Sequence, residues 1–201
     1  MSTLVLALGL GVIVVRRRSL AIALVAAQSF TLGLIALDLA GGRSSEFLVS
    51  GLVLLVKAAV LPALLLLLLR RTREPRLVPA AAGPLVRLAG AAAVALLAAA
   101  LVPPLGLGDP HAERISVAVV LVGVSIVIAR RPALFQLLGL IVAENGLSLL
   151  AIAVPGGLPY VIELGALLDL GLVVAVAAAF TRRIHDELGT GDTELLRGLS
   201  D

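Results

Sequence analysis

The sequence predicts an all-α polytopic membrane protein with about seven transmembrane helices, and three observations lead to this fold class. Hydrophobic residues make up 60% of the 201 positions, and charged residues only 14%. The mean hydropathy is +1.14, which no soluble domain of this length needs. The apolar runs are continuous rather than alternating, and this pattern excludes a membrane β-barrel.

Seven apolar segments make up most of the chain. A helix needs about 20 residues to cross a hydrocarbon core of about 30 Å, so the first and fifth segments are short and rely on arginine side chains that reach the interface. Arg16–Arg18 follow the first segment instead of preceding it, which predicts an uncleaved helix rather than a signal peptide. The segments are residues 2–15, 19–40, 46–69, 84–104, 114–129, 132–154 and 158–181.

Arginines mark one side of the predicted bundle. If seven helices cross the membrane, the loops on the opposite side hold only Arg43 and Arg114. By the positive-inside rule, the amino terminus is outside and the carboxy terminus is cytoplasmic. The residues on the basic side are Arg16, Arg17, Arg18, Arg70, Arg71, Arg73, Arg76, Arg130, Arg131, Arg182 and Arg183.

An internal repeat emerges when the chain is compared with itself at an offset of 112–113 residues. GVIVVRRRSLAIALVAAQSF resembles SIVIARRPALFQLLGLIVAEN, and EFLVSGLVLLVKAAVLPALLLLLLRR resembles YVIELGALLDLGLVVAVAAAFTRR. A single helix between the copies gives them the same orientation, so the prediction is two parallel three-helix repeats. The expected regions are a first repeat at 1–76, a linker helix with an outer loop at 77–113, a second repeat at 114–183 and a cytoplasmic tail at 184–201.

Ionisable residues inside the predicted helices are candidates for function, because a charge at membrane depth costs about 2.5–3.5 kcal/mol or more. Lys57 and Asp169 each stand 13 residues before a closing Arg-Arg pair, and Glu144 stands 13 residues after Arg131. Thirteen residues of α-helix span about 20 Å. We therefore expect Lys57, Glu144 and Asp169 to form one layer near the middle of the membrane.

This layer has two interpretations. In the first it is a proton relay, because a low-dielectric environment brings carboxylic acids and amines towards conditions where protons exchange. In the second, Lys57 pairs with one acid and pins the two repeats together. A single structural ion pair needs only two ionisable groups, so the presence of three favours the relay. Asn145 next to Glu144, and Gln28 nearer the cytoplasmic end of its helix, are supporting polar groups.

Glu163 lies about one turn inside the outer end of the last predicted helix. It could admit protons, or it could be an acid in an early helical turn that the helix dipole favours. Asp38 and Arg87 stand near predicted helix ends, where we expect them to be interfacial.

The composition limits the chemistry of the chain. It contains no cysteine, which excludes a cysteine-ligated iron–sulfur cluster, and its two histidines, His111 and His185, fall in predicted loops or tails on opposite sides. We expect no metal, no cofactor and no catalytic centre in this chain, so any redox chemistry belongs to a partner. Aromatic residues are only 2%, and a nucleic-acid-binding face is not expected.

At ENGLSLL, ELGALLDL and DTELLRGL, the chain resembles the component E subunit of hydrogenase-4 and formate-hydrogenlyase-type complexes. Its last three predicted helices are also similar to the K-type subunit of complex I and the C-type subunit of Mrp antiporters. In those families two membrane-embedded glutamates on successive helices belong to the proton pathway. The first maps near Ile141 and Glu144, and the second maps by spacing to Asp169, with Glu163 as a competing candidate.

The resemblance implies a non-catalytic membrane subunit of a hydrogenase-type or complex-I-like respiratory complex, which couples redox chemistry to proton translocation. The implied partners are antiporter-like membrane subunits and a cytoplasmic redox arm, in the cytoplasmic membrane of a bacterium or archaeon. Two alternatives remain open. One is a subunit of an Mrp-type cation/proton antiporter, and the other is a purely structural adaptor between antiporter-like subunits.

Overall fold

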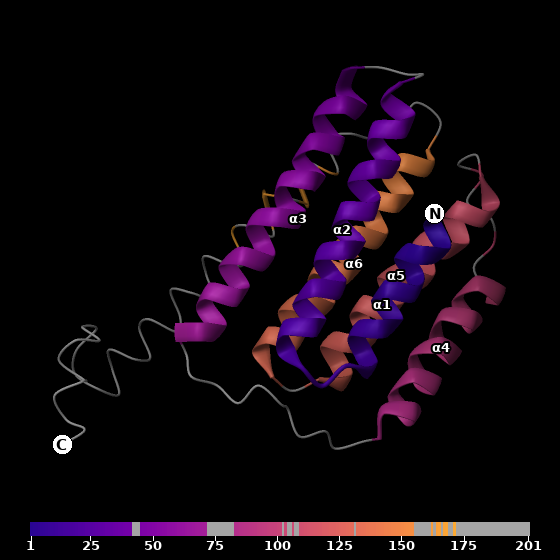
Figure 1. The fold of residues 1–201 in the computed structure, drawn as a ribbon. Coiled ribbons are helices and arrows are strands. Elements are labelled where there is room, and N and C mark those ends of the chain that lie inside the picture. Colours follow the sequence, from indigo (N-terminus) through magenta and orange to yellow (C-terminus); the bar gives the residue numbers. More distant parts are fainter. Residues whose placement is uncertain are drawn as a thin grey trace, which may run out of the picture.

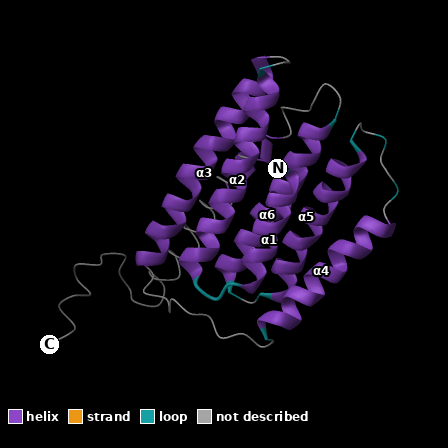
Figure 2. Ribbon diagram, turned by 45° about the vertical axis from the view of Figure 1, so that its right-hand side comes forward, coloured by secondary structure: helices purple, strands orange, loops and turns teal. Residues whose placement is uncertain are grey.

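The computed structural model is all-helical over the residues that it describes, and its six helices run antiparallel in chain order (Figures 1 and 2). The described residues are 1–41, 45–71, 83–101, 103, 106, 109–130, 132–154, 162, 164, 165, 167, 168 and 171. The helices are α1 (Ser2–Val14), α2 (Arg18–Ala40), α3 (Ser45–Arg71), α4 (Pro84–Leu101), α5 (Pro110–Ala129) and α6 (Ala133–Ala153).

Four of these helices, α2, α3, α5 and α6, are long and apolar enough to cross a membrane, whereas α1 and α4 are apolar but shorter. The predicted all-helical class, with several apolar helices of membrane-spanning length, is therefore confirmed. The seventh predicted segment, 158–181, falls mostly outside the described residues, so the count of seven and the two repeats stay predictions.

The ends of most helices lie close to the predicted ends, but α5 begins four residues before the predicted position. Asp109 caps this helix, because its side chain accepts a hydrogen bond of 2.9 Å from the backbone N–H of His111. Pro110 occupies the first helical position, where its missing N–H costs nothing. His111, expected in a loop, is therefore an exposed residue in the first turn of α5.

The helices form a bundle with α3 at one edge and α4 at the other (Figure 1). α3 packs along α2, while α4 packs on α5 and α1. Between the edges, α6 packs against both α5 and α2, and α1 packs against α2 and α5. Polar side chains in the middle of α2, α3 and α6 are thereby enclosed by other helices.

Glycines allow two helix pairs to approach closely. A β-carbon added to Gly139 of α6 would lie 2.8 Å from the carbonyl oxygen of Gly123 in α5, and one added to Gly33 of α2 would lie 2.8 Å from a methyl group of Leu55 in α3. Small residues at helix contacts are a common way to pack helices in a membrane. The α2–α3 and α5–α6 pairs are thus held at short separations.

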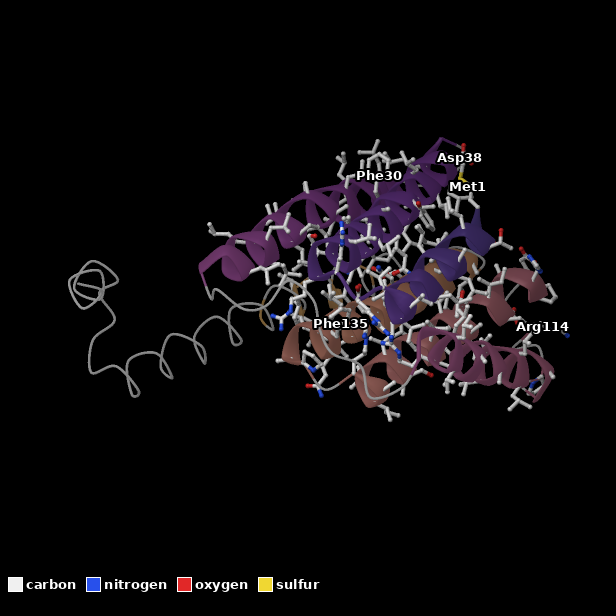
Figure 3. All side chains as sticks on the ribbon, turned by 60° about the horizontal axis from the view of Figure 1, so that its bottom comes forward. Met1, Phe30, Asp38, Arg114 and Phe135 are labelled. Carbon is white, nitrogen blue, oxygen red and sulfur yellow. The ribbon has the colours of Figure 1, made fainter. Side chains whose placement is uncertain are left out.

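One end of the bundle, which we name the arginine end, contains Arg16, Arg18, Arg87 and Arg130. Here α1 and α5 end while α2, α4 and α6 begin. Arg130 donates a hydrogen bond to the carbonyl oxygen of Val15, and its guanidinium carbon lies 3.9 Å from the ring centre of Phe135. Figure 3 shows nitrogen atoms near the labelled Phe135, whereas Asp38 and Arg114 lie towards the opposite end.

Candidate functional site

The centre of the bundle contains a buried polar network that joins four helices. Its side chains come from the middle parts of α2, α3 and α6, and it reaches a backbone carbonyl of α1. The participating side chains are Gln28 and Ser29 of α2, Lys57 of α3, and Glu144, Asn145 and Ser148 of α6. All six residues are buried.

The network is centred on an ion pair between Lys57 and Glu144. The Lys57 ammonium donates to Oε2 of Glu144. The two side chains are 4% and 7% exposed, respectively. Removing two charges from solvent is costly, and removing one member of such a pair leaves the other charge uncompensated. The pair therefore links α3 to α6 across the bundle.

Asn145 connects the ion pair to α2. Its Oδ1 accepts a hydrogen bond of 3.3 Å from the Lys57 ammonium, and its Nδ2 donates one of 3.0 Å to Oε1 of Gln28. The hydroxyl of Ser29 lies 3.1 Å from the same Nδ2 and 3.3 Å from Oδ1. Because only the oxygen can accept from an ammonium group, these contacts fix the orientation of the Asn145 amide.

Gln28 extends the network to α1. Its Nε2 donates a hydrogen bond of 2.8 Å to the carbonyl oxygen of Val5. Gly9, one helical turn along α1, leaves the space for this amide, since a β-carbon there would lie 3.2 Å from Nε2. The path from Val5 to Glu144 is thus continuous through Gln28, Asn145 and Lys57.

The second oxygen of the Glu144 carboxylate is also occupied. Ser148, one turn further along α6, donates a hydrogen bond of 3.1 Å to Oε1. On another side the carboxylate lies against Gly165, where an added β-carbon would be 2.9 Å from Cδ of Glu144. A side chain at position 165 would therefore displace the carboxylate.

The structure brings together four of the six candidates from the sequence, Lys57, Glu144, Asn145 and Gln28. Glu163 and Asp169 lie outside the described residues, so their place relative to the ion pair stays a prediction. Arg87 lies in the first turn of α4, near the helix end where it was expected, and it is buried, at 7% exposed, because α4 packs on α1 and α5. Its place at the membrane interface stays a prediction.

The hydroxyl groups of Ser29 and Ser148 and the carbonyl of Val5 were not predicted from the sequence. Ser148 stands four residues after Glu144, a spacing that places both on one helix face, so this contact had a detectable signal. The contacts of Ser29 and Val5 had no signal in the sequence, because the packing of α1, α2 and α6 decides their partners.

The arrangement can hold a proton in two places. The ammonium and carboxylate can exchange a proton and become a neutral amine and acid, which a low-dielectric interior tolerates better than an isolated charge. The hydroxyls of Ser29 and Ser148 can each donate and accept a hydrogen bond, whereas the amides of Gln28 and Asn145 orient their neighbours. Among the described residues, no three His, Cys, Asp or Glu side chains gather as a metal site requires.

The fold and the site define the class: over its described residues the protein is all-helical, with four helices long and apolar enough to cross a membrane and a buried ion pair between two of them. The chain is similar to the uncharacterized protein Rv0085 of Mycobacterium tuberculosis, with 33% identity over 157 residues, which cover 74% of this chain and 70% of the relative. The chain belongs to the family of Rv0085. No protein-family model matches the chain. No solved structure matches it either.

Proposed function

We propose that this chain is a non-catalytic integral membrane subunit of a proton-translocating complex of the hydrogenase or complex I type. In this proposal Glu144 and Lys57 carry protons, while Asn145 and Gln28 hold the pair in place. Asp169 or Glu163 would continue the pathway beyond Glu144, as the resemblance of the carboxy-terminal helices to proton-channel subunits implies.

The observation that carries the proposal is the buried Lys57–Glu144 pair with its extension through Asn145 and Gln28 to α1. Ionisable side chains buried at membrane depth are costly and mark ion or proton pathways in many membrane proteins. The network also lies near the midpoints of its helices, where a proton crossing the membrane meets the highest barrier.

The proposed orientation places the arginine end in the cytoplasm of a bacterium or archaeon and the amino terminus outside. It is supported by the four arginines gathered at this end, since cytoplasmic ends carry an excess of Lys and Arg. The proposed partners are antiporter-like membrane subunits and a cytoplasmic redox arm. In an Mrp-type antiporter the same site would work without the redox arm, and the proteins that copurify with this chain separate the two assemblies.

A structural adaptor is the second candidate, and one observation favours it. Both Glu144 oxygens are engaged, one by Lys57 and the other by Ser148. A carboxylate held in this way could serve only to hold α3 and α6 together, without changing its protonation state.

Proton uptake by membrane vesicles that contain the assembled complex distinguishes the two roles. Glu144→Gln keeps the size of the side chain but removes its ability to ionise, so the relay predicts a loss of at least tenfold in proton translocation. The pinning role predicts wild-type uptake per complex, provided that the variant assembles.

Glu113→Gln is the matched control, because Glu113 is a buried acid at the start of α5 (2% exposed) and no member of the network. It is expected to keep proton uptake. Wild-type coupling in an assembled Glu144→Gln complex would exclude the relay.

A further inference from the structure

The arginine end holds a group of cations that the proposed proton pathway does not use. Arg87 lies in the first turn of α4, Arg130 caps the end of α5, and Arg16 lies exposed in the link between α1 and α2. Burial, followed by the charges of Arg87 and Arg16, lowers the pKa of Arg130 to about 10. The charges of Arg87 and Arg16 thus act unfavourably on the Arg130 cation.

These buried guanidinium groups have unused hydrogen-bond donors. Arg87 is 7% exposed and Arg130 is 3% exposed. Within the part of the chain that the structure describes, Nε, Nη1 and Nη2 of Arg87 have no hydrogen-bond partner, and neither have Nε and Nη1 of Arg130. A buried charged donor without a partner is strongly unfavourable. An anion with several acceptor oxygens would satisfy these donors and relieve the repulsion.

The surrounding structure already fixes the geometry of one of these groups. One face of the Arg130 guanidinium covers the ring of Phe135, and its Nη2 donates to the Val15 carbonyl. Its remaining nitrogens are thereby held in a fixed place. Arg87 stands at a helix N-terminus, where the dipole disfavours a cation and favours an anion. A phosphate at this point would interact favourably with both arginines and with the start of α4.

The place of the two arginines on their helices indicates where the anion comes from. Arg87 lies in the first turn of α4, and Arg130 directly follows α5, which is long and apolar enough to cross a membrane. A basic group at the end of such a helix lies at the depth of the phospholipid headgroups, whose phosphates have several acceptor oxygens. Basic sites between transmembrane helices on the cytoplasmic side bind such headgroups in other proteins.

We propose that Arg87, Arg130 and Arg16 bind the phosphate of an anionic phospholipid at the arginine end. The site requires only that the chain lies in a membrane. It is independent of the proposed proton pathway, so failure of one does not decide the other.

Native mass spectrometry of the full-length chain, released from detergent micelles with added lipid, tests the site. The probes are phosphatidylglycerol, phosphatidylcholine with the same acyl chains, and inorganic phosphate. The wild-type chain is expected to bind phosphatidylglycerol at least tenfold more tightly than phosphatidylcholine. Arg87→Gln and Arg130→Gln are expected to remove most of this preference.

Arg114→Gln is the matched control, because Arg114 is an exposed arginine towards the opposite end of the bundle (Figure 3). It is expected to keep the preference for phosphatidylglycerol. Equal binding of the two lipids by the wild-type chain, or an unchanged preference in Arg87→Gln, would overturn the site. Displacement of the lipid by millimolar inorganic phosphate would overturn the lipid as its source.

Thermal unfolding of the wild-type chain keeps the proposal testable if the arginine variants fail to fold. A ligand that binds only the folded state raises the melting temperature. Phosphatidylglycerol is expected to raise it, while phosphatidylcholine and inorganic phosphate leave it unchanged. No difference between the two lipids would contradict the proposal.

Discussion

Lys57 of α3 and Glu144 of α6 form a buried ion pair, although 86 residues separate them in the sequence and α4 and α5 lie between their helices in chain order. Asn145 accepts a second hydrogen bond from the same ammonium, 3.3 Å away. The position of the Lys57 charge is therefore set by two neighbouring residues of one helix, and each contact can be removed separately.

Removing only the Lys57 cation should lower the free energy of unfolding more than removing both charges. Lys57→Met leaves the Glu144 carboxylate buried without this partner, and the free energy of unfolding is expected to fall by about 3–5 kcal/mol. Adding Glu144→Gln should recover much of that loss, because the unpaired charge is then gone. Denaturant titration in detergent micelles measures the four corners of this double-mutant cycle. Additive effects of the two changes would contradict a direct pair.

Asn145 is expected to matter more for stability than Ser148. Asn145→Leu removes one acceptor of Lys57, which keeps its bond to Glu144, and the donor to Oε1 of Gln28. The buried Gln28 oxygen then loses this donor, and the cost should be about 1–3 kcal/mol. Ser148→Ala removes one hydrogen bond to Glu144, with an expected cost of about 0.5–1.5 kcal/mol. The same denaturant titration ranks them, and a larger effect of Ser148→Ala would refute the central position of Asn145.

Gly165 is expected to protect the position of the Glu144 carboxylate. In Gly165→Ala the new methyl group would lie 2.9 Å from Cδ of Glu144, so the carboxylate must move away from Lys57 or Ser148. Proton uptake should fall towards the level of Glu144→Gln. Gly171→Ala is the matched control, since nothing lies within 4 Å of the added carbon. Equal uptake in the two alanine variants would count against this contact.

Gly146 is expected to be required for the approach of α6 to α5. A β-carbon at Gly146 would lie 2.7 Å from the backbone nitrogen of Val120 and 3.0 Å from the carbonyl oxygen of Ser116. Backbone atoms cannot rotate away, so Gly146→Ala should lower the free energy of unfolding by about 1–3 kcal/mol.

Gly90→Ala gives the comparison for that change. Gly90 lies in α4 with nothing within 4 Å of its added carbon, and alanine is favoured over glycine in a helix by about 0.5–1 kcal/mol. It should therefore stabilise the chain or leave it unchanged. A loss in Gly90→Ala as large as in Gly146→Ala would show that helix contact is not the cause.

The helices themselves could be predicted because continuous apolar runs between arginines and prolines define their ends. The predicted start of α5 was wrong because the helix extends into a polar stretch. Asp109 caps it there, and Pro110 is tolerated at the first helical position. Local side-chain chemistry decided that boundary, and apolar periodicity does not report it.

The depth of Lys57 and Glu144 could be estimated by counting residues from the arginines, since an α-helix has a fixed rise. The direction of their side chains could not be estimated, because it depends on which helices pack together. For the same reason the burial of Arg87 and Arg130 was missed. The sequence marks both as basic residues near helix ends, and only the packing of α4 on α1 and α5 encloses them.

The protonation state of Glu144 during turnover decides whether this residue is a proton carrier. Infrared difference spectra of vesicles with the assembled complex, recorded with and without its driving reaction, report the carbonyl stretch of a protonated carboxylic acid. A proton relay through Glu144 predicts a difference band that is present in the wild type and in Glu113→Gln and absent in Glu144→Gln. An unchanged band in Glu144→Gln, or no carboxylic acid band in the wild type, would contradict it.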